Sequence, residues 1–221
     1  LIHLPVQSGS DKILNLMNRK HTIKKYLEIF YKLKNINSKI QFSSDFIISY
    51  PGEDDNDFKN TLKLIDEIRF INSFSFVFSP RPGTVASTLP TIDKKKSFEK
   101  LEIVQKKLFK NQIDMNKSLE NSLIEVMVEN RTDNKSKLFG RSPYMTSVLF
   151  DGDDNLIGKI VKIKIQNSNR NTLFGMVARQ SNQKVAWKLS ISTKKNLDTN
   201  LKFVYSDNNT LSVIFHDNDL L

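Results

Sequence analysis

The chain has 221 residues, of which 38% are hydrophobic and 26% charged, so it is long enough for one or two domains with packed cores. Its formal net charge of +10 favours an anionic partner such as nucleic acid, although a lysine-rich proteome would produce the same excess. The absence of cysteine excludes disulfides, cysteine-ligated zinc, a thiol nucleophile and an iron–sulfur cluster ligated by this stretch of chain.

No apolar run approaches the roughly 20 residues of a membrane-spanning helix, and the first residues do not resemble a signal peptide. We therefore expect a cytoplasmic protein that is not attached to a membrane. The chain starts at Leu1, and residues 1–6 already have the pattern of a strand. These two features lead us to expect a fragment that begins within a domain.

The first half of the chain repeats a strand followed by a polar, glycine-containing loop. Strands are predicted over residues 1–6, 40–50 and 74–78, and helices over 10–17, from Thr22 onward and over 57–69. This order predicts βα units of a parallel barrel or open sheet, but three units are too few to close a barrel. In such folds the loops after the strands face a ligand, although a loop that only reverses the chain would have a similar sequence.

A helix is predicted from Asp93 to about Leu119, and the hydrophobic period then changes from 3.6 to 2. Short strands near 144–150, 158–165 and 172–178 predict a small antiparallel barrel. One segment of this region mixes cations with an aromatic ring, as RNA-binding surfaces do, although a plain surface hairpin would look alike. The candidate RNA-binding residues are Lys135, Lys137, Phe139 and Arg141.

The last residues have a different composition. Residues 180–199 are polar and rich in lysine, and the apolar runs 201–205 and 211–215 flank an Asp-Asn-Asn turn. A hairpin is predicted there. The sequence assigns no role to residues 180–221.

Several motifs in order resemble the radical-SAM methylthiotransferases. They are His3-Leu4-Pro5-Val6-Gln7-Ser8-Gly9-Ser10-Asp11, Met17-Asn18-Arg19-Lys20, Tyr50-Pro51-Gly52-Glu53 and Phe74-Ser75-Phe76-Val77-Phe78-Ser79-Pro80-Arg81-Pro82-Gly83-Thr84. Residues 120–178, with Gly140-Arg141-Ser142, resemble the TRAM domain of those enzymes. The match covers roughly residues 1–178.

The resemblance implies an α/β fold plus a small all-β domain. Residues 1–116 would be the carboxyl-terminal half of a radical-SAM (βα) partial barrel with its connector helix. Residues 117–179 would be an antiparallel TRAM barrel that binds RNA, and residues 180–221 would be a polar tail and hairpin of unknown role.

Within the family, the Gln-Ser-Gly-Ser string and the Phe-rich strand are most similar to the branch that modifies tRNA. That branch adds a methylthio group to C2 of an isopentenylated adenosine just 3′ of the anticodon. The resemblance implies two molecules of S-adenosylmethionine and two 4Fe-4S clusters, whose cysteine ligands are not in this chain. We expect a monomer that binds tRNA. The alternatives are a non-catalytic RNA-binding module and the related enzyme that acts on threonylcarbamoyl-adenosine.

The resemblance also indicates site residues. The cofactor cleft would be lined by Gln7, Ser8, Ser49, Tyr50, Pro51 and Gly52. Family members usually have glycine where Ser49 stands, so its side chain could crowd a ligand. Arg81 would hold a carboxylate or a substrate phosphate, with a salt bridge to a loop acid as the alternative. Glu53 is a candidate functional acid, but we favour a role in capping the next helix together with Asp54 and Asp55.

No catalytic residue is assigned within this chain. The three histidines, His3, His21 and His216, do not have the spacing of metal ligands, and no metal site is predicted.

Overall fold

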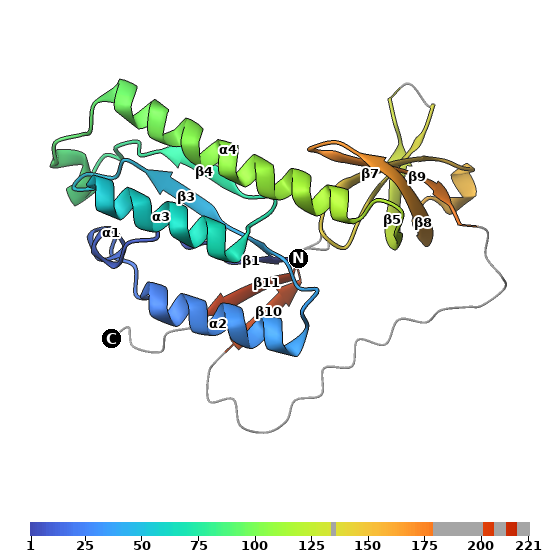
Figure 1. Cartoon of the computed structure of the whole chain (residues 1–221), viewed down its shortest axis with the longest axis horizontal. Coiled ribbons are helices and arrows are strands. Elements are labelled where there is room, and N and C mark those ends of the chain that lie inside the picture. Colours follow the sequence, from blue (N-terminus) through green and yellow to red (C-terminus); the bar gives the residue numbers. More distant parts are fainter. Residues whose placement is uncertain (134–135, 179–200, 206–210, 216–221) are drawn as a thin grey trace.

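A computed structural model describes residues 1–133, 136–178, 201–205 and 211–215 (Figure 1). The predicted order of strands and helices in the first half is confirmed. The elements are β1 (Ile2–His3), α1 (Asp11–Leu16), α2 (Ile23–Ile36), β2 (Phe42–Ser43), β3 (Asp45–Ile48), α3 (Asp55–Ile68), β4 (Phe74–Val77), a short 3₁₀ turn η1 (Val85–Thr88) and α4 (Lys94–Ser118).

The single strand predicted over residues 40–50 is instead two short strands. β2 pairs in parallel with β1, whereas β3 pairs in parallel with β4. Ser44 lies between them, and its hydroxyl accepts the N–H of Val6 at 2.9 Å while its own N–H donates to the hydroxyl of Ser73 at 2.9 Å. Side-chain hydroxyls thus replace ladder partners at this residue and interrupt the strand, although Gln7, in the chain after β1, still pairs with β3.

Local capping explains where the helices begin. Ser10 and Thr22 accept backbone N–H groups of the first turns of α1 and α2, as the sequence predicts. α3 begins two residues earlier than predicted because Asp54 and Asp57 form a capping box. Asp54 is therefore the cap, and the prediction that Glu53 also caps this helix is wrong.

The helices cover one face of the parallel strands. Their apolar stripes pack on strand residues to form one core, which includes Val6, Phe46, Ile48, Ile65 and Val104. Full burial of each such side chain contributes about 1.5–3 kcal/mol. On β4, by contrast, the rings of Phe74 and Phe76 are 61% and 56% exposed and lie nearly parallel to each other. β4 therefore presents an aromatic surface to solvent.

α4 leads from this first part to a small barrel (Figure 1). β5 (Leu123–Arg131), β6 (Leu138–Arg141), β7 (Ser147–Asp151), β8 (Ile160–Ser168) and β9 (Thr172–Val177) close in the order β5-β6-β7-β9-β8, with a short 3₁₀ turn η2 (Asp154–Leu156) between β7 and β8. The predicted small barrel is confirmed, but it is not wholly antiparallel because β7 pairs with β9 in parallel. Among the described strands, only these five close into a barrel.

Glycines allow the barrel strands to approach closely. A Cβ atom on Gly140 of β6 would lie 2.4 Å from the carbonyl oxygen of Met127, and one on Gly175 would lie 2.5 Å from the carbonyl oxygen of Lys164. Any side chain at either position would collide with the backbone of the neighbouring strand.

The predicted terminal hairpin is also confirmed. β10 (Leu201–Tyr205) and β11 (Leu211–Phe215) are antiparallel, and β11 pairs in parallel with β1 (Figure 1). This second pairing was not predicted. The predicted polar segment 180–199 lies outside the described residues. None of the helices in the described ranges is long and apolar enough to cross a membrane.

Candidate functional site

The Gln7-Ser8-Gly9-Ser10 segment is fastened to the first turns of α3. Ser8 is buried, and its hydroxyl accepts the N–H of Ser10 at 3.2 Å and lies 3.5 Å from the hydroxyl of Thr61. The N–H of Gly9 donates to the Thr61 hydroxyl at 2.9 Å. A Cβ atom on Gly9 would lie 2.5 Å from the Thr61 Cα. The Ser8 hydroxyl, predicted to face a cofactor, is therefore hydrogen bonded within the protein.

Gln7 continues the sheet beyond β1. Its N–H donates to the carbonyl of Asp45 and its carbonyl accepts the N–H of Ile47, at 3.0 and 2.9 Å. Its φ of 73° is in the left-handed region, and the residue is 8% exposed. The side-chain amide hydrogen bonds to no other group in the described part of the chain.

A cluster of ion pairs and hydrogen bonds, which was not predicted from the sequence, holds α1 against α3. The Ser10 hydroxyl donates to Asp57 at 2.6 Å, and the Lys12 ammonium bonds Asp57 at 2.7 Å and Asp54 at 2.8 Å. Lys12 and two backbone N–H groups lower the pKa of Asp54 to about 2. Burial acts to raise the pKa of Asp57, but the N–H of Asp54, Lys12 and Ser10 together lower it. These acids are therefore ionised helix-start residues.

The loop after β3 forms a tight turn. The N–H of Glu53 donates to the carbonyl of Tyr50 at 2.9 Å, and Gly52 has a φ of 89°, as the third residue of a type II turn requires. Ser49, just before the turn, has a φ of 60°. Glycine adopts this conformation without strain, whereas serine does not.

The hydroxyl of Ser49 makes no hydrogen bond with the residues that the structure describes. The residue is 3% exposed, and its Oγ is buried without a partner among the described residues. Its N–H donates to the carboxylate of Glu53 at 3.1 Å. The Ser49 hydroxyl is therefore a buried polar group that the described residues leave unsatisfied.

Tyr50 brings the loops together. Its hydroxyl donates to the carbonyl of Leu16 at 3.0 Å, and its ring packs edge-on against Phe78 at 4.9 Å. Ile13 and Ala86 belong to the same buried cluster. The regions that follow β1, β3 and β4 thus converge, as the prediction of a common site requires.

Glu53 pairs with the last helix of the first part. Its buried carboxylate lies 3.3 Å from the Lys100 ammonium on α4. Burial raises the pKa of Glu53, while Lys100 and the N–H of Ser49 oppose this shift. Sequence reasoning missed the pair because the two residues are 47 positions apart.

Arg81 lies in the exposed loop after β4. Its carbonyl accepts the N–H and the hydroxyl of Thr84, at 3.2 and 2.8 Å. Its guanidinium makes no ion pair within the described ranges, so the alternative of a salt bridge to a loop acid is not observed there. A role in binding an anion stays a prediction.

The residues predicted to bind RNA are on and next to β6. Lys135 lies outside the described residues. Lys137 pairs with Asp151 at 3.1 Å, and the Arg141 guanidinium lies 4.8 Å above the ring of Phe139. Arg141 also lies 3.5 Å from Glu129. Barrel acids therefore partly neutralise both described cations.

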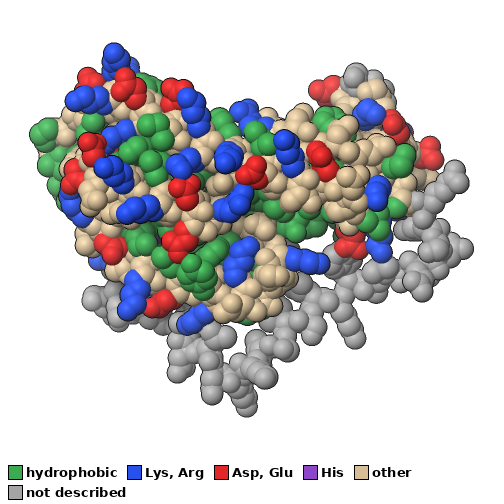
Figure 2. All heavy atoms as spheres, viewed as in Figure 1, with side chains coloured by type: hydrophobic (Ala, Val, Ile, Leu, Met, Phe, Trp, Pro, Cys, Tyr) green, Lys and Arg blue, Asp and Glu red, His purple; other side chains and the backbone are tan. Residues whose placement is uncertain are grey.

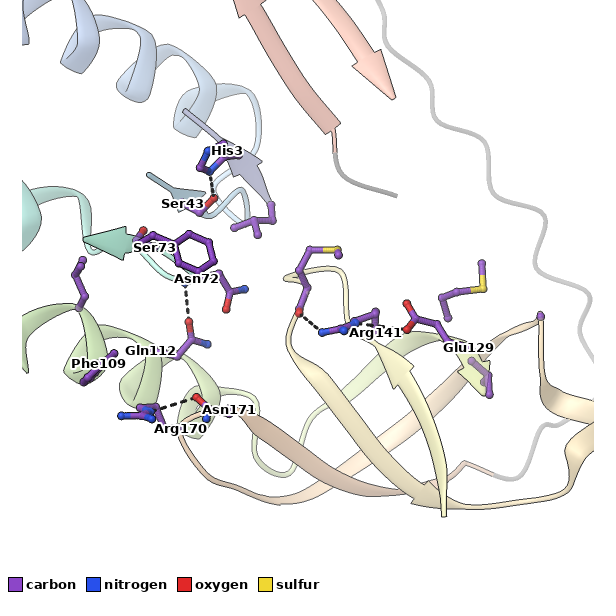
Figure 3. A pocket seen from close by; sticks show the side chains of 17 residues that line it. His3, Ser43, Asn72, Ser73, Phe109, Gln112, Glu129, Arg141, Arg170 and Asn171 are labelled. Carbon is purple, nitrogen blue, oxygen red and sulfur yellow. Dashed lines mark hydrogen bonds and ion pairs between the residues drawn. The ribbon is translucent and has the colours of Figure 1, made fainter. Parts of the chain in front are cut away.

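A hollow of about 1030 Å³ lies between the first part and the barrel (Figure 3). Its walls come from the start of β4, from α4, from β5 and β6, and from the turn before β9. Arg141 lines it, as does Arg170, whose guanidinium lies 4.2 Å above the ring of Phe109. Sequence reasoning missed Arg170 because its aromatic partner lies on a distant helix.

Hydrogen bonds fix the two walls relative to each other. The side chain of Asn72 donates to the carbonyl of Tyr144 at 2.5 Å, and its N–H donates to the side chain of Gln112 at 2.8 Å. The fully buried Asn116 donates to the carbonyls of Asn169 and Arg170 at 2.8 and 2.9 Å. The barrel is therefore docked on α4 through a satisfied polar network.

The basic excess is dispersed. Figure 2 shows Lys and Arg side chains interspersed with Asp and Glu over the face that it presents. Several of these cations are paired, as Lys107 is with Asp66 and Arg69 with Asp114. Such exposed pairs contribute about 0–1 kcal/mol each.

Comparison with known proteins identifies both parts of the chain. The Radical SAM superfamily matches residues 1–65, and the TRAM domain matches residues 117–178. The resemblance predicted from the motifs is thus confirmed. The β5–β9 barrel, which fills the second range, is compatible with a TRAM domain.

Similar proteins carry the name tRNA-2-methylthio-N(6)-dimethylallyladenosine synthase. One from Pelagibacter ubique (strain HTCC1062) is 61% identical over 186 residues, which are 84% of this chain and 42% of the relative. One from Ruthia magnifica subsp. Calyptogena magnifica is 47% identical over 79% of this chain and 39% of the relative. One from Orientia tsutsugamushi (strain Boryong) is 42% identical over 81% and 40%. The chain spans about two fifths of the length of these relatives.

The Radical SAM superfamily implies S-adenosylmethionine and iron–sulfur chemistry. A cluster needs thiolate ligands, and the chain has no cysteine. The described residues contain no group of three His, Asp or Glu side chains that could hold a metal ion. The residues of this chain therefore do not fit a cluster by themselves.

Proposed function

We propose that this chain forms part of a tRNA methylthiotransferase that converts N6-isopentenyladenosine next to the anticodon to its 2-methylthio derivative. The 61% identity to a synthase of that name, over 84% of the chain, is the observation that carries the proposal. The chain would act as a monomer in the cytoplasm, where its tRNA substrate is found.

In this proposal, residues 1–116 are the second half of a radical-SAM barrel and residues 117–179 are its RNA-binding TRAM domain. Parallel pairing of β1 with β2 and of β3 with β4 supports the first assignment, as do the helices on one face only. The exposed rings of Phe74 and Phe76 would then face the interior of the radical-SAM barrel. Residues 180–221 would add an edge strand to β1 through β11.

The loops at the carboxyl ends of the strands would bind S-adenosylmethionine, which supplies the methyl group and the radical-forming adenosyl group. The buried hydroxyl of Ser49 has no hydrogen-bond partner among the described residues, and the side-chain amide of Gln7 would be a second hydrogen-bonding group there. The turn formed by Tyr50, Pro51 and Gly52 would let the backbone approach the ligand closely. Ser8 would act indirectly, by holding the loop against α3.

Arg81 would hold an anionic group at the mouth of the site. Its exposed guanidinium is free of acidic partners within the described residues, so it can form a bidentate pair with a carboxylate or phosphate. On the small barrel, the β6 surface of Lys137, Phe139 and Arg141 would contact tRNA, together with Lys135. Two synthase-bound clusters are part of the proposed full reaction, with ligands outside this chain.

The lack of cysteine favours one second candidate, a non-catalytic RNA-binding module. An experiment in cells separates the two. In a strain deleted for the gene that encodes this chain, we expect tRNA nucleosides to lose the methylthio derivative and to accumulate isopentenyladenosine, as measured by mass spectrometry. The intact gene should restore the product.

Arg81 supplies a sharper version of this test. Complementation with Arg81→Ala should restore much less product than complementation with Arg81→Lys, which keeps the charge. Loss of a threonylcarbamoyl derivative instead would identify the related enzyme. An unchanged nucleoside profile in the deletion strain would leave the RNA-binding module as the function.

A further inference from the structure

We propose that the hollow between α4 and the barrel extends the β6 RNA surface beyond Arg141 and holds a single-stranded segment of the substrate away from the reacting adenosine. This inference rests on the proposed function, because it takes the ligand to be tRNA. The residues that would contact the single-stranded segment of tRNA are chiefly Arg170 and Phe109.

The guanidinium of Arg170 lies over the ring of Phe109 at the wall of the hollow. The guanidinium lies 4.2 Å above the ring, and its Nε donates to the side chain of Asn171 at 3.2 Å (Figure 3). No acid pairs with Arg170 in the part of the chain that the structure describes. A stacked guanidinium keeps most of its N–H donors free for phosphate and offers a flat face to a base.

The opposite wall carries further groups of the same chemistry. Phe74, at the start of β4, is 61% exposed and lines the hollow. Arg141, which lies over Phe139 on β6, lines it as well and donates to the Ser147 hydroxyl at 3.2 Å. Two arginines and two exposed rings thus line one space of about 1030 Å³, together with Glu129, which lies 3.5 Å from Arg141 and leaves Arg170 as the arginine without an acidic partner among the described residues. Cations combined with stacking surfaces are typical of single-strand binding grooves.

The hollow is at the opposite end of the parallel strands from the cofactor loops. Leu1, His3, Ser43, Ser73 and Phe74 line it, whereas the Gln7–Ser10 segment and the loops after β3 and β4 form the candidate cofactor site. A four-residue strand such as β3 separates the two ends by roughly 13 Å at about 3.3 Å per residue. RNA in the hollow would therefore be a flanking segment and not the modified nucleotide.

The walls are preorganised for such a ligand. Asn116 and Asn72 bind barrel carbonyl groups, so Arg170 on the barrel side and Phe109 on α4 are held in register without RNA. A rigid site loses less entropy when it binds than one that must first assemble.

Binding of labelled tRNA to the full chain tests the inference. A tRNA transcript with adenosine just 3′ of its anticodon is titrated in a fluorescence anisotropy assay at several salt concentrations. We expect Arg170→Ala to weaken binding by about tenfold and to reduce the salt slope by about one. Phe109→Leu keeps an apolar side chain on α4 and should weaken binding with little change in the salt slope.

The matched control is Lys106→Ala, which removes one charge from α4 outside the hollow, where Lys106 pairs with Glu102. Its affinity should stay within about twofold of the parent chain. Arg170→Lys keeps the charge but not the plane, and should lie between the parent and Arg170→Ala. Circular dichroism spectra equal to that of the parent chain establish that each variant is folded.

Two results overturn the inference in distinguishable ways. If the parent chain binds tRNA and the Arg170 and Phe109 variants bind it equally well, the hollow is not an RNA site, while the proposed function stands. If the parent chain does not bind tRNA at any salt concentration, both the hollow and the RNA contact in the proposed function are refuted.

Discussion

The Ser49→Gly substitution is expected to stabilise the first part of the chain. Ser49 has a φ of 60°, a left-handed conformation that costs a non-glycine residue about 1–2 kcal/mol. Its buried hydroxyl has no partner among the described residues, and such a group costs about 1–3 kcal/mol. Glycine lowers the free energy of unfolding by about 0.5–1 kcal/mol, because it increases the entropy of the unfolded chain. The net gain is about 1–4 kcal/mol.

Ser49→Ala separates the two contributions, because alanine removes the hydroxyl but keeps the strained backbone. Its stability should lie between that of the parent and that of Ser49→Gly. Ser49→Val adds a β-branched side chain at positive φ and should be less stable than the parent.

Urea unfolding followed by far-ultraviolet circular dichroism measures these differences, because the described α-helices all lie in the first part of the chain. The transition midpoint should rise for Ser49→Gly with an unchanged slope. A midpoint for Ser49→Gly at or below that of Ser49→Ala would refute the assignment of backbone strain. A midpoint for Ser49→Ala below that of the parent would refute the unsatisfied hydroxyl.

Four further predictions concern other parts of the chain. Lys137→Glu combined with Arg141→Glu should weaken tRNA binding and flatten its salt dependence in a filter-binding titration; equal affinity would remove the β6 surface from the interface. Gly140→Ala should lower the melting temperature of the barrel, because a Cβ there would lie 2.4 Å from a carbonyl oxygen of β5; an unchanged melting temperature would contradict this contact. The pKa of Asp54 is lowered from 3.8 to about 2, so the ionised carboxylate should stabilise the fold fully above pH 3.8 and lose this effect as the pH falls through about 2. In thermal melts, Asp54→Asn should therefore have a lower melting temperature than the parent at pH 7 and the same melting temperature below about pH 2; a difference that persists below about pH 2 would contradict this. Deletion of residues 179–221 should expose the edge of β1 and promote aggregation in light scattering, and a clear solution of the shortened chain would contradict this.

Local signals predicted the elements well. Ser10 and Thr22 cap helices because a side-chain hydroxyl reaches the N–H groups of the next turn, which is a property of a few consecutive residues. The change of hydrophobic period after residue 122 likewise predicted the barrel. The motifs predicted the Radical SAM and TRAM assignments.

Long-range pairing could not be predicted in the same way. The strand over residues 40–50 is interrupted at Ser44 because its hydroxyl and N–H bond Val6 and Ser73, and the sequence of the strand does not reveal those distant partners. The contacts of Glu53 with Lys100 and of Arg170 with Phe109 join distant segments for the same reason.

The candidate site shows the same division between local and long-range information. The pattern placed Gln7, Ser8 and the Ser49–Gly52 turn at the ends of strands, and the structure has them there. The sequence pattern could not reveal that the Ser8 hydroxyl contacts the Thr61 hydroxyl on α3, because this contact depends on how α3 packs against the loop.

We propose that the first part and the barrel of this chain contact one anticodon arm together. Hydroxyl-radical footprinting of tRNA with the full chain detects such a contact. We predict protection of the anticodon loop and of flanking nucleotides, with the flanking protection reduced in Arg170→Ala. Protection confined to the acceptor arm, or no protection at all, would contradict the claim.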